Sequence, residues 1–492
     1  MRKVLIANRG EIAVRVARTC RALGIATVAV YSEADVTARH VFAADEALPI
    51  GPAEASRSYL DIDAIVAAAR RSGADAIHPG YGFLSQNGDF AEAVATAGLI
   101  FVGPPAAVHR SMGDKSAARR LMASAGVPVL PGYDGADQGD EVLASEAARI
   151  GWPVMIKPSR GGGGKGMRVV ARPEDFASAL AASRREARGA FGDDAMVLER
   201  FVSRPRHVEV QVLADAAGNV LHLFERECSI QRRHQKVVEE TPSPALTDDQ
   251  RRRLCVAGVA AARAAAYVNA GTVEFLLDAD GSFHFLEMNT RLQVEHPVTE
   301  AVTGLDIVRL QLEIAAGRAL PLVQEDVVAR GHALECRLYA EDPDNDDLPS
   351  PGRVLHLVAP EGPGVRFDSG IAVGSEVTAH YDPLLAKVVT WGSDRAEAAA
   401  RMRRALEDTV LLGVTTNRER LREIVGHPAF LRGELHTGFL DEHFATDPGP
   451  RSLPPEALGA ALAALSLEPV SRSRPSESNV DPWSTVGPWR LA

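Results

Sequence analysis

Acidic, amide and basic side chains are concentrated in the segment from residue 287 to residue 300, which reads EMNTRLQVEHPVTE. Just before it, GTVEFLLDADGSFHFLEMN contains two alternating apolar runs around Asp280-Gly281, a dipeptide typical of tight β-hairpins. If these two residues form the turn, residue 279 faces residue 282 and Glu274 lies directly opposite Glu287. Like charges at opposed strand positions repel each other unless another group neutralises them.

A divalent cation would neutralise these two glutamates. Asn289 lies two residues beyond Glu287, so the alternation of a strand places it on the same face, where its amide oxygen is a third ligand. Carboxylate and amide oxygens without a thiolate suit Mg²⁺ or Mn²⁺ shared with substrate phosphates. The alternative is a pair of solvated glutamates on an open sheet face.

A run of four glycines lies in KPSRGGGGKGM, residues 157 to 167, directly after an apolar run. Because glycine has no Cβ, such a loop can bring consecutive backbone N–H groups onto a phosphate. The spacing does not fit a Walker A loop. We expect a mobile lid that closes over nucleotide phosphates, and the alternative is a flexible surface turn.

Lysine is rare in this chain. Only six of the 54 basic residues are lysines, and they are Lys3, Lys115, Lys157, Lys165, Lys236 and Lys387. Lysine presents a compact charge with freely rotating donors, whereas arginine presents a rigid fork, so the few lysines indicate where to search for chemistry. Two of them flank the glycine run. Lys387, in HYDPLLAKV, is given a structural role by default.

The elements that position these residues follow from hydrophobic patterns. KVLIA, EIAVRVARTCRALG and ATVAVYS are predicted as a strand, a helix and a strand, which begin a doubly wound α/β domain. The turn ANRGE lacks the GxGxxG spacing of a dinucleotide site, so we expect none there. Further α/β units complete a first domain at residues 1–113.

A second domain is predicted at residues 114–325, with a mobile lid at about 131–203. WPVMIKPS, MVLERFV, HVEVQVLAD and VLHLFERE are its predicted strands, and a helix is expected from about Asp248 to Ala266. A third domain, 330–444, contains the helix RAEAAARMRRALEDTVL. Residues 445–492 are rich in Pro and Ser and indicate a linker or the start of a further domain, although Trp483 and Trp489 suggest that the tail docks on its own domain.

Bulk properties exclude several classes of protein. The formal charge of −11 argues against a nucleic-acid partner. The four scattered cysteines form no CxxC pair, which disfavours disulfides and zinc and favours a reducing, cytoplasmic location. The N-terminal apolar run is too short for a signal peptide, and no run of about 18 apolar residues is present, so we expect no membrane association.

Several stretches together resemble the biotin carboxylase family, whose members are ATP-grasp enzymes. They are HPGYGFLSQN, GDK, GGGGKGM, RPRHVEVQVLAD, ECSIQRRHQKVVEE and EMNTRLQVEHPVTE, and the resemblance covers residues 1 to 444. It implies an ATP-grasp fold with an N-terminal Rossmann-like domain and a C-terminal α+β domain. It also implies carboxylation of biotin by bicarbonate and ATP through carboxyphosphate.

The resemblance implies a role for each matching residue. ATP would contact Lys115, Lys157, Gly163, Gly164, Glu199, Arg200, Phe201, Val202, His207, Gln231 and His234. Metal ions would bind Glu274, Glu287 and Asn289. Bicarbonate would lie among Lys236, Arg291, Gln293, Val294 and Glu295, with Glu295 as the general base, and biotin would meet Tyr81 and Arg337. The histidines and Arg337 have structural alternatives, as satisfied core groups or an ion-pair partner.

Two residues depart from the family pattern. Gln86 stands where the family usually has Glu, and Pro158 follows Lys157 where a small residue is usual. We expect activity to survive with altered biotin affinity. No lysine follows a Met as in a biotin carrier, so biotin is expected on another polypeptide or beyond residue 492.

The resemblance implies further partners. PSRGGGGKGMR, PEGPGVRFDSG, LLGVTTNRERL and DPWSTVGPWRLA look most like methylcrotonoyl-CoA carboxylase α-type chains, although acetyl- and propionyl-CoA systems stay open. A biotin carrier, a carboxyltransferase subunit and a second copy of the chain are the expected partners. The competing hypotheses are another ATP-grasp carboxylate-amine ligase and a nucleotide-binding scaffold without catalysis.

Overall fold

Three larger sheets organise the chain in this computed structural model, which describes residues 1–159, 166–445, 457 and 459. The first sheet is parallel, with spatial order β3 (Glu46–Gly51), β2 (Ala26–Ser32), β1 (Lys3–Ile6), β4 (Ala76–His78) and β5 (Ile100–Phe101). The helices of this region are α1 (Gly10–Ala22), α2 (Arg39–Ala43), α3 (Ile62–Ser72), α4 (Gly88–Thr96) and α5 (Ala106–Gly113). The predicted opening of strand, helix and strand is confirmed, and so is the α/β fold class.

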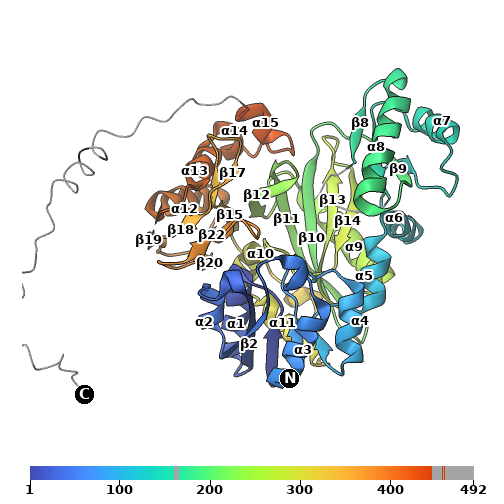
Figure 1. Cartoon of the computed structure of the whole chain (residues 1–492). Coiled ribbons are helices and arrows are strands. Elements are labelled where there is room, and N and C mark those ends of the chain that lie inside the picture. The colour runs from blue at the N-terminus through green and yellow to red at the C-terminus, as the bar shows by residue number, and fades with distance from the viewer. Residues whose placement is uncertain (160–165, 446–456, 458, 460–492) are drawn as a thin grey trace, which may run out of the picture. The chain divides into compact units, whose positions relative to one another are not determined.

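The second sheet is antiparallel and has eight strands. Their order is β14 (Phe283–Asn289), β13 (Asn269–Leu277), β10 (Arg206–Ala214), β11 (Val220–Arg232), β12 (Gln235–Thr241), β15 (His332–Tyr339), β22 (Leu384–Gly392) and β20 (Val365–Ser369). Strand β12 pairs directly with β15. The sheet therefore continues from the predicted second domain into the predicted third domain (Figure 1).

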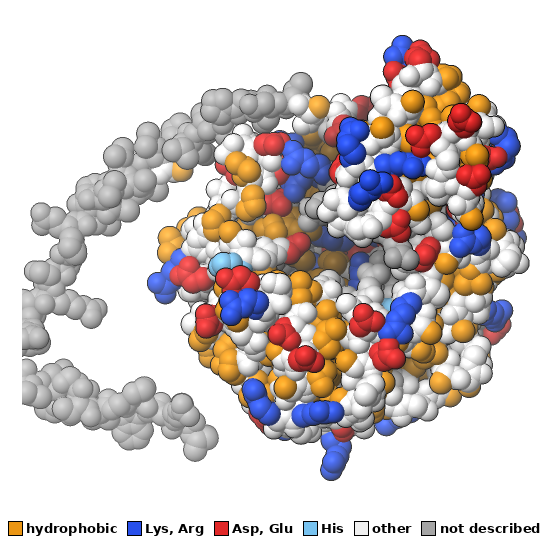
Figure 2. Space-filling view, turned by 45° about the vertical axis from the view of Figure 1, so that its right-hand side comes forward, with side chains coloured by type: hydrophobic (Ala, Val, Ile, Leu, Met, Phe, Trp, Pro, Cys, Tyr) orange, Lys and Arg blue, Asp and Glu red, His pale blue; other side chains and the backbone are white. Residues whose placement is uncertain are grey.

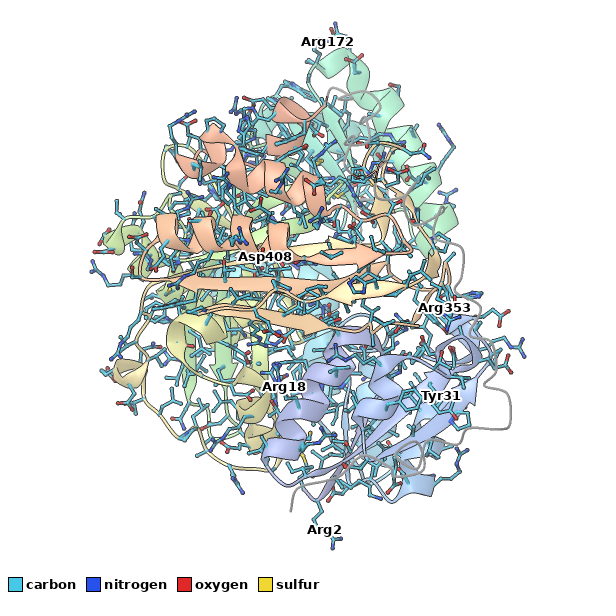
Figure 3. All side chains as sticks on the ribbon, turned by 90° about the vertical axis from the view of Figure 1, so that its left-hand side faces the viewer. Arg2, Arg18, Tyr31, Arg172, Arg353 and Asp408 are labelled. Atoms are coloured by element: carbon cyan, nitrogen blue, oxygen red, sulfur yellow. The ribbon has the colours of Figure 1, made fainter. Side chains whose placement is uncertain are left out.

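The two faces of this sheet differ in chemistry because each strand alternates apolar and polar residues. Val208, Val210 and Val212 of β10 pack in the core under α9 (Asp248–Ala264), and Leu334 and Leu338 of β15 pack under α12 (Arg395–Asp408). The side chains at the intervening strand positions project from the opposite face, toward α10 (His296–Thr303) and α1. Figure 3 shows α12 and α1 on opposite sides of the sheet, with Arg18 labelled on α1.

The third sheet lies in the predicted lid. Its order is β6 (Gly132–Tyr133), β9 (Met196–Arg200), β7 (Val154–Pro158) and β8 (Arg168–Val170), and α7 (Asp140–Ile150) and α8 (Phe176–Phe191) pack against it. The core between them contains Leu143, Ile156 and Leu180. Gly163, Gly164 and Lys165 of the glycine run lie outside the described residues.

Shorter elements complete the described chain. The remaining helices are α6 (Lys115–Ser124), α11 (Ile307–Ala315), α13 (Arg418–Gly426), α14 (Pro428–Leu431) and α15 (Phe439–His443). The remaining strands are β16 (Glu341–Asp342), β17 (Leu348–Pro349), β18 (Gly352–Arg353), β19 (His356–Val358), β21 (Glu376–Val377) and β23 (Val410–Leu412). None of the described helices has the length and apolar character needed to cross a membrane. Trp483 and Trp489 of the tail lie outside the described residues.

Candidate active site

The hairpin that carries Glu274 and Glu287 is formed by β13 and β14. Its turn differs from the prediction, because Leu277 faces Phe283 and the Asp278 N–H donates to the Ser282 carbonyl at 2.8 Å, so residues 279–281 form the loop. The expected pairing of 279 with 282 is wrong. A register shift between Glu274 and Phe275 compensates for the longer loop, and Glu274 does lie opposite Glu287 as predicted.

Asn289 lies beside these two carboxylates. Its Nδ2 donates to Glu274 Oε1 at 2.8 Å and to Glu287 Oε1 at 3.4 Å, while its Oδ1 accepts from Arg291 Nη2 at 3.2 Å. Two carboxylates and one amide in contact fit a hard divalent cation, which would require Asn289 to present its oxygen instead of its nitrogen. The three predicted metal ligands are thus brought together.

Lys236 is the cationic centre of the site. Its Nζ lies 2.6 Å from Glu209, 2.8 Å from Glu274 and 2.7 Å from Glu295. Burial by itself raises the pKa of Glu274, but Lys236 and His207 lower it well below its usual value. The lysine therefore joins the predicted metal ligands to the predicted general base.

Glu209 is a functional candidate that sequence reasoning missed. It pairs directly with Glu274 across β10 and β13, and the fully buried Arg226 donates to Glu209 Oε1 at 2.6 Å. Arg226 also donates to Gln211 and Thr299, which fixes its side chain. The sequence alternation HVEVQV could have identified Glu209, because the side chain of a Glu between two buried valines must lie on the opposite face of the strand.

Glu295 and Arg337 meet on the polar face of the sheet. Arg337 Nη2 donates to Glu295 Oε2 at 3.0 Å, and Arg337 Nε donates to Glu239 Oε1 at 2.5 Å. Burial raises the pKa of Glu295, but the neighbouring Lys236 and Arg337 lower it well below its usual value. Glu295 is therefore ionised and able to accept a proton, and it becomes a stronger base when these cations turn to another anion.

Among the described residues, the hydrogen-bond partners of Arg291 are all neutral. It donates to Gln86 Oε1 at 2.6 Å, to the Leu292 carbonyl at 3.1 Å and to the side chains of Gln293 and Asn289. Within residues 1–159 and 166–445, it forms no ion pair. A guanidinium whose charge is not neutralised by a carboxylate is suited to an anionic ligand.

Two adjoining cavities lie between the lid sheet and the hairpin. One, of about 210 Å³, is lined by Lys115, Lys157, Glu287 and other polar groups, and Lys157 contacts Glu199. The other, of about 310 Å³, is mostly apolar and is lined at one side by Glu199, Arg200, Phe201 and Val202. Figure 2 shows the surface hollowed beside the lobe that carries α7 and α8.

Three further predicted nucleotide contacts line these cavities. His207 Nε2 lies 2.9 Å from Glu274 Oε2, and Gln231 Nε2 lies 2.9 Å from His207 Nδ1. His234 borders both cavities and has a backbone φ of 66°. Burial lowers the pKa of Lys115, against the opposite effect of Glu287. The polar cavity fits the phosphates of a nucleotide, and the adjoining apolar cavity fits its purine base.

A separate cavity of about 370 Å³ is lined partly by residues of the N-terminal region, such as Gly10 and Tyr81. Tyr81, Arg291, Val294 and Arg337 are among the residues that line it. The two predicted biotin residues, Tyr81 and Arg337, therefore line the same cavity as two of the predicted bicarbonate residues, Arg291 and Val294.

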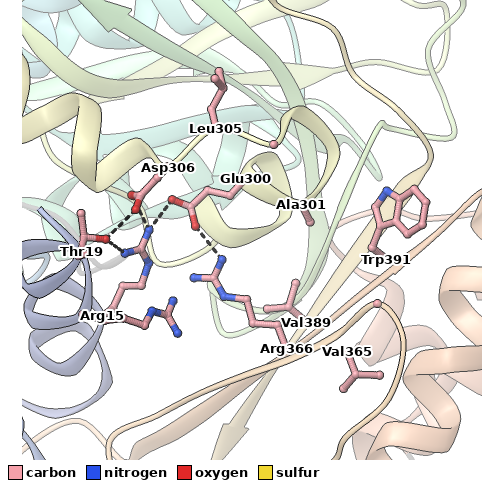
Figure 4. Close-up of a pocket in the computed structure, with 14 residues that line it drawn as sticks. Arg15, Thr19, Glu300, Ala301, Leu305, Asp306, Val365, Arg366, Val389 and Trp391 are labelled. Atoms are coloured by element: carbon pink, nitrogen blue, oxygen red, sulfur yellow. Dashed lines mark hydrogen bonds and ion pairs between the residues drawn. The ribbon is translucent and has the colours of Figure 1, made fainter.

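A further cavity, of about 520 Å³, lies beside α1 and is drawn in Figure 4. Most of its charged groups pair with each other, since Arg15 Nη2 lies 2.6 Å from Glu300 and 2.8 Å from Asp306, and Arg366 Nη1 lies 2.7 Å from Glu300. It contains none of the predicted site residues.

Comparisons with known proteins identify the family of this chain. Family models match at residues 1–108 (biotin carboxylase, N-terminal domain), 114–323 (carbamoyl-phosphate synthase L chain, ATP binding domain) and 335–442 (biotin carboxylase C-terminal domain). The solved structure of a biotin carboxylase-β-γ-ATP complex from Campylobacter jejuni is 45% identical, with a TM-score of 0.87 over 90% of this chain and 99% of that one.

Curated relatives are of two kinds. The mitochondrial methylcrotonoyl-CoA carboxylase subunit α of Dictyostelium discoideum is 49% identical over 99% of this chain, which spans 70% of that relative, and only 62% of the rat subunit. The biotin carboxylase of a Nostoc species is 51% identical over 89% of this chain and 98% of its own length. The chain therefore belongs to the biotin carboxylase family of ATP-dependent ligases.

Proposed function

We propose that the residues described above carboxylate biotin with bicarbonate and ATP. The observation that carries this assignment is the meeting of Lys236, Glu295 and Arg337 on one face of the sheet. Beside them lies Arg291, which has no carboxylate partner among the described residues. A bicarbonate oxygen attacks the γ-phosphate and forms carboxyphosphate, a transfer that depends mainly on positioning and charge neutralisation.

Lys115 and Lys157 bind the nucleotide phosphates. The base lies beside Glu199, Arg200, Phe201 and Val202. His207, Gln231 and His234 complete this pocket, and Gly163 and Gly164 of the lid are proposed to cover the phosphates. Glu274, Glu287 and Asn289 hold Mg²⁺ or Mn²⁺, which supplies charge neutralisation at the transferred phosphate. The cavities and contacts of these residues, apart from the two glycines, support this assignment.

Arg291 and Lys236, with Gln293 and the backbone of Val294, hold bicarbonate, and Glu295 takes its proton. When Lys236 and Arg337 turn from Glu295 to the substrates, the pKa of Glu295 rises toward a value useful for a base, which couples base strength to substrate binding. Carboxyphosphate then breaks down to carbon dioxide and phosphate, and the released phosphate takes the proton of the biotin ureido N–H. Arg337 stabilises the resulting enolate-like ureido oxygen while the deprotonated biotin nitrogen adds to the carbon dioxide. Tyr81 and Arg337 line one cavity, which is the proposed biotin cavity.

The biotin is proposed to arrive on a carrier domain or protein, and a carboxyltransferase subunit would pass the carboxyl group to an acyl-CoA. The relatives named methylcrotonoyl-CoA carboxylase support methylcrotonoyl-CoA as this acyl-CoA. A homodimer is supported by a structure neighbour described as a domain dimer. A reducing, cytoplasmic location is consistent with the four cysteines, all free and buried.

The test is ADP release by the full chain, with and without bicarbonate and free biotin. We expect release that requires bicarbonate and rises with biotin, in the presence of Mg²⁺. Release that is insensitive to both compounds would contradict the proposal. Release that requires an amine instead would identify the rival carboxylate-amine ligase.

A further inference from the structure

Lys387 is fully buried on β22, directly beside Arg337 in the sheet register. Its Nζ donates to the carbonyl oxygen of Val294 at 2.8 Å and lies 3.2 Å from Glu11 Oε1. The same nitrogen lies 5.9 Å from the centroid of the Tyr81 ring. Lys387 thus contacts both a wall of the proposed biotin cavity and residues 291–295, the segment proposed to bind bicarbonate.

Glu11 fixes the other end of this contact. It lies in the first turn of α1, and the Tyr81 hydroxyl donates to its Oε1. The close packing of α1 on the C-terminal region requires Gly370, because a Cβ there would lie 2.6 Å from the backbone nitrogen of Glu11. Glu11, Lys387 and Tyr81 therefore keep a fixed relation to each other.

A purely structural role does not account well for a buried lysine. Desolvation of a buried ion pair opposes its Coulomb attraction, so apolar residues of similar volume are often as stabilising. Lys387 also directs one donor to a backbone carbonyl that precedes Glu295. Because the peptide unit is planar, holding the Val294 carbonyl also fixes the direction of the Glu295 N–H.

We propose that Lys387 is a positioning residue for residues 291–295, and that it acts by holding the Val294 carbonyl while Glu11 holds Lys387. The proposal rests on the function proposed above and deepens it. Loss of the donor frees this segment to rotate, which weakens bicarbonate binding more than ATP binding. Arg291 and Glu295, on either side of Val294, are the groups that lose alignment.

The test uses neutral replacements, which avoid an unpaired buried charge. In the full chain, E11Q/K387M removes both charges and the donor to Val294, whereas E11Q/K387Q keeps an amide donor on a side chain that is one bond shorter. We expect E11Q/K387M to raise the KM for bicarbonate about tenfold, with a smaller rise in E11Q/K387Q and a KM for ATP within about twofold of wild type. Lys3→Met is the matched control, since Lys3 pairs with Glu46 at the surface.

Thermal midpoints show which variants fold. The inference is overturned if either folded double variant keeps the wild-type KM for bicarbonate, or if the KM values for bicarbonate and ATP rise together. If E11Q/K387M does not fold, E11Q/K387Q alone decides by the same comparison. Absence of bicarbonate-dependent ADP release in the wild-type chain would instead contradict the proposed function.

Discussion

Gln86 determines how much of the positive charge of Arg291 is available to an anion. It accepts from Arg291 Nε at 2.6 Å, and the substitution Gln86→Glu would put a carboxylate at that position. An anion held at the other end of the guanidinium would lie about 6 Å from the new charge. Two unit charges at that distance repel by about 0.7 kcal/mol in bulk water and about 1.4 kcal/mol at an effective dielectric constant of about 40.

Because Gln86 is exposed, the lower figure is the better guide, and we expect the KM for bicarbonate to rise about threefold. The assay is ADP release at varied bicarbonate, at low and high ionic strength, since salt screens an exposed charge. Gln86→Ala is the control, because it removes the side-chain acceptor for Arg291 without adding charge. If Gln86→Glu and Gln86→Ala give the same KM, or if salt has no effect on their difference, the electrostatic reasoning is wrong.

Three further predictions follow from the site. Glu295→Gln removes the proton acceptor, so we expect biotin-dependent turnover to fall at least about a hundredfold at an unchanged thermal midpoint; full turnover in a folded variant would refute the base assignment. Glu287→Gln removes one proposed metal ligand, and a titration of Mg²⁺ at fixed ATP should show half-maximal activity at about tenfold higher metal, whereas an unchanged curve would remove Glu287 from the metal site. Burial raises the pKa of Glu239 to about 7, against the lowering effect of Arg337, so acid below about pH 7 protonates the carboxylate that holds Arg337. With bicarbonate ion held constant, the biotin-dependent rate should fall as the pH drops through 7, and Glu239→Gln should give a low rate that no longer changes over this range.

The sequence predicted local elements well where the hydrophobic period was strong. The opening strand, helix and strand were found as expected, and the helix expected from Asp248 ends at Ala264, two residues before the predicted Ala266. The prediction of a two-residue turn at Asp280-Gly281 was wrong. A three-residue loop with a bulge places the same two glutamates opposite each other as a two-residue turn would. Such a compensation depends on backbone geometry that residue types do not reveal.

Long-range pairing was the main feature that sequence patterns did not supply. Glu209 lies beside Glu274 because β10 pairs with β13, and it reaches Lys236 because only β11 separates β10 from β12. Lys387 reaches Val294 from β22, which follows β15 in the sheet. The rarity of lysine drew attention to Lys115, Lys157 and Lys236, which the structure brings to the candidate site. The structural role given to Lys387 by default stays a prediction. The assignment of roles within the site came from family resemblance and stays a prediction until the variants are measured.

The pairing of β12 with β15 has a practical consequence for anyone who cuts this chain into pieces. A fragment that stops near residue 328 would leave the backbone N–H and C=O groups of β12 without their neighbours, and an open strand edge recruits other chains and promotes aggregation. The same fragment would also lack Arg337 and Lys387. Insolubility of such a fragment would therefore report a severed sheet rather than a lack of nucleotide affinity.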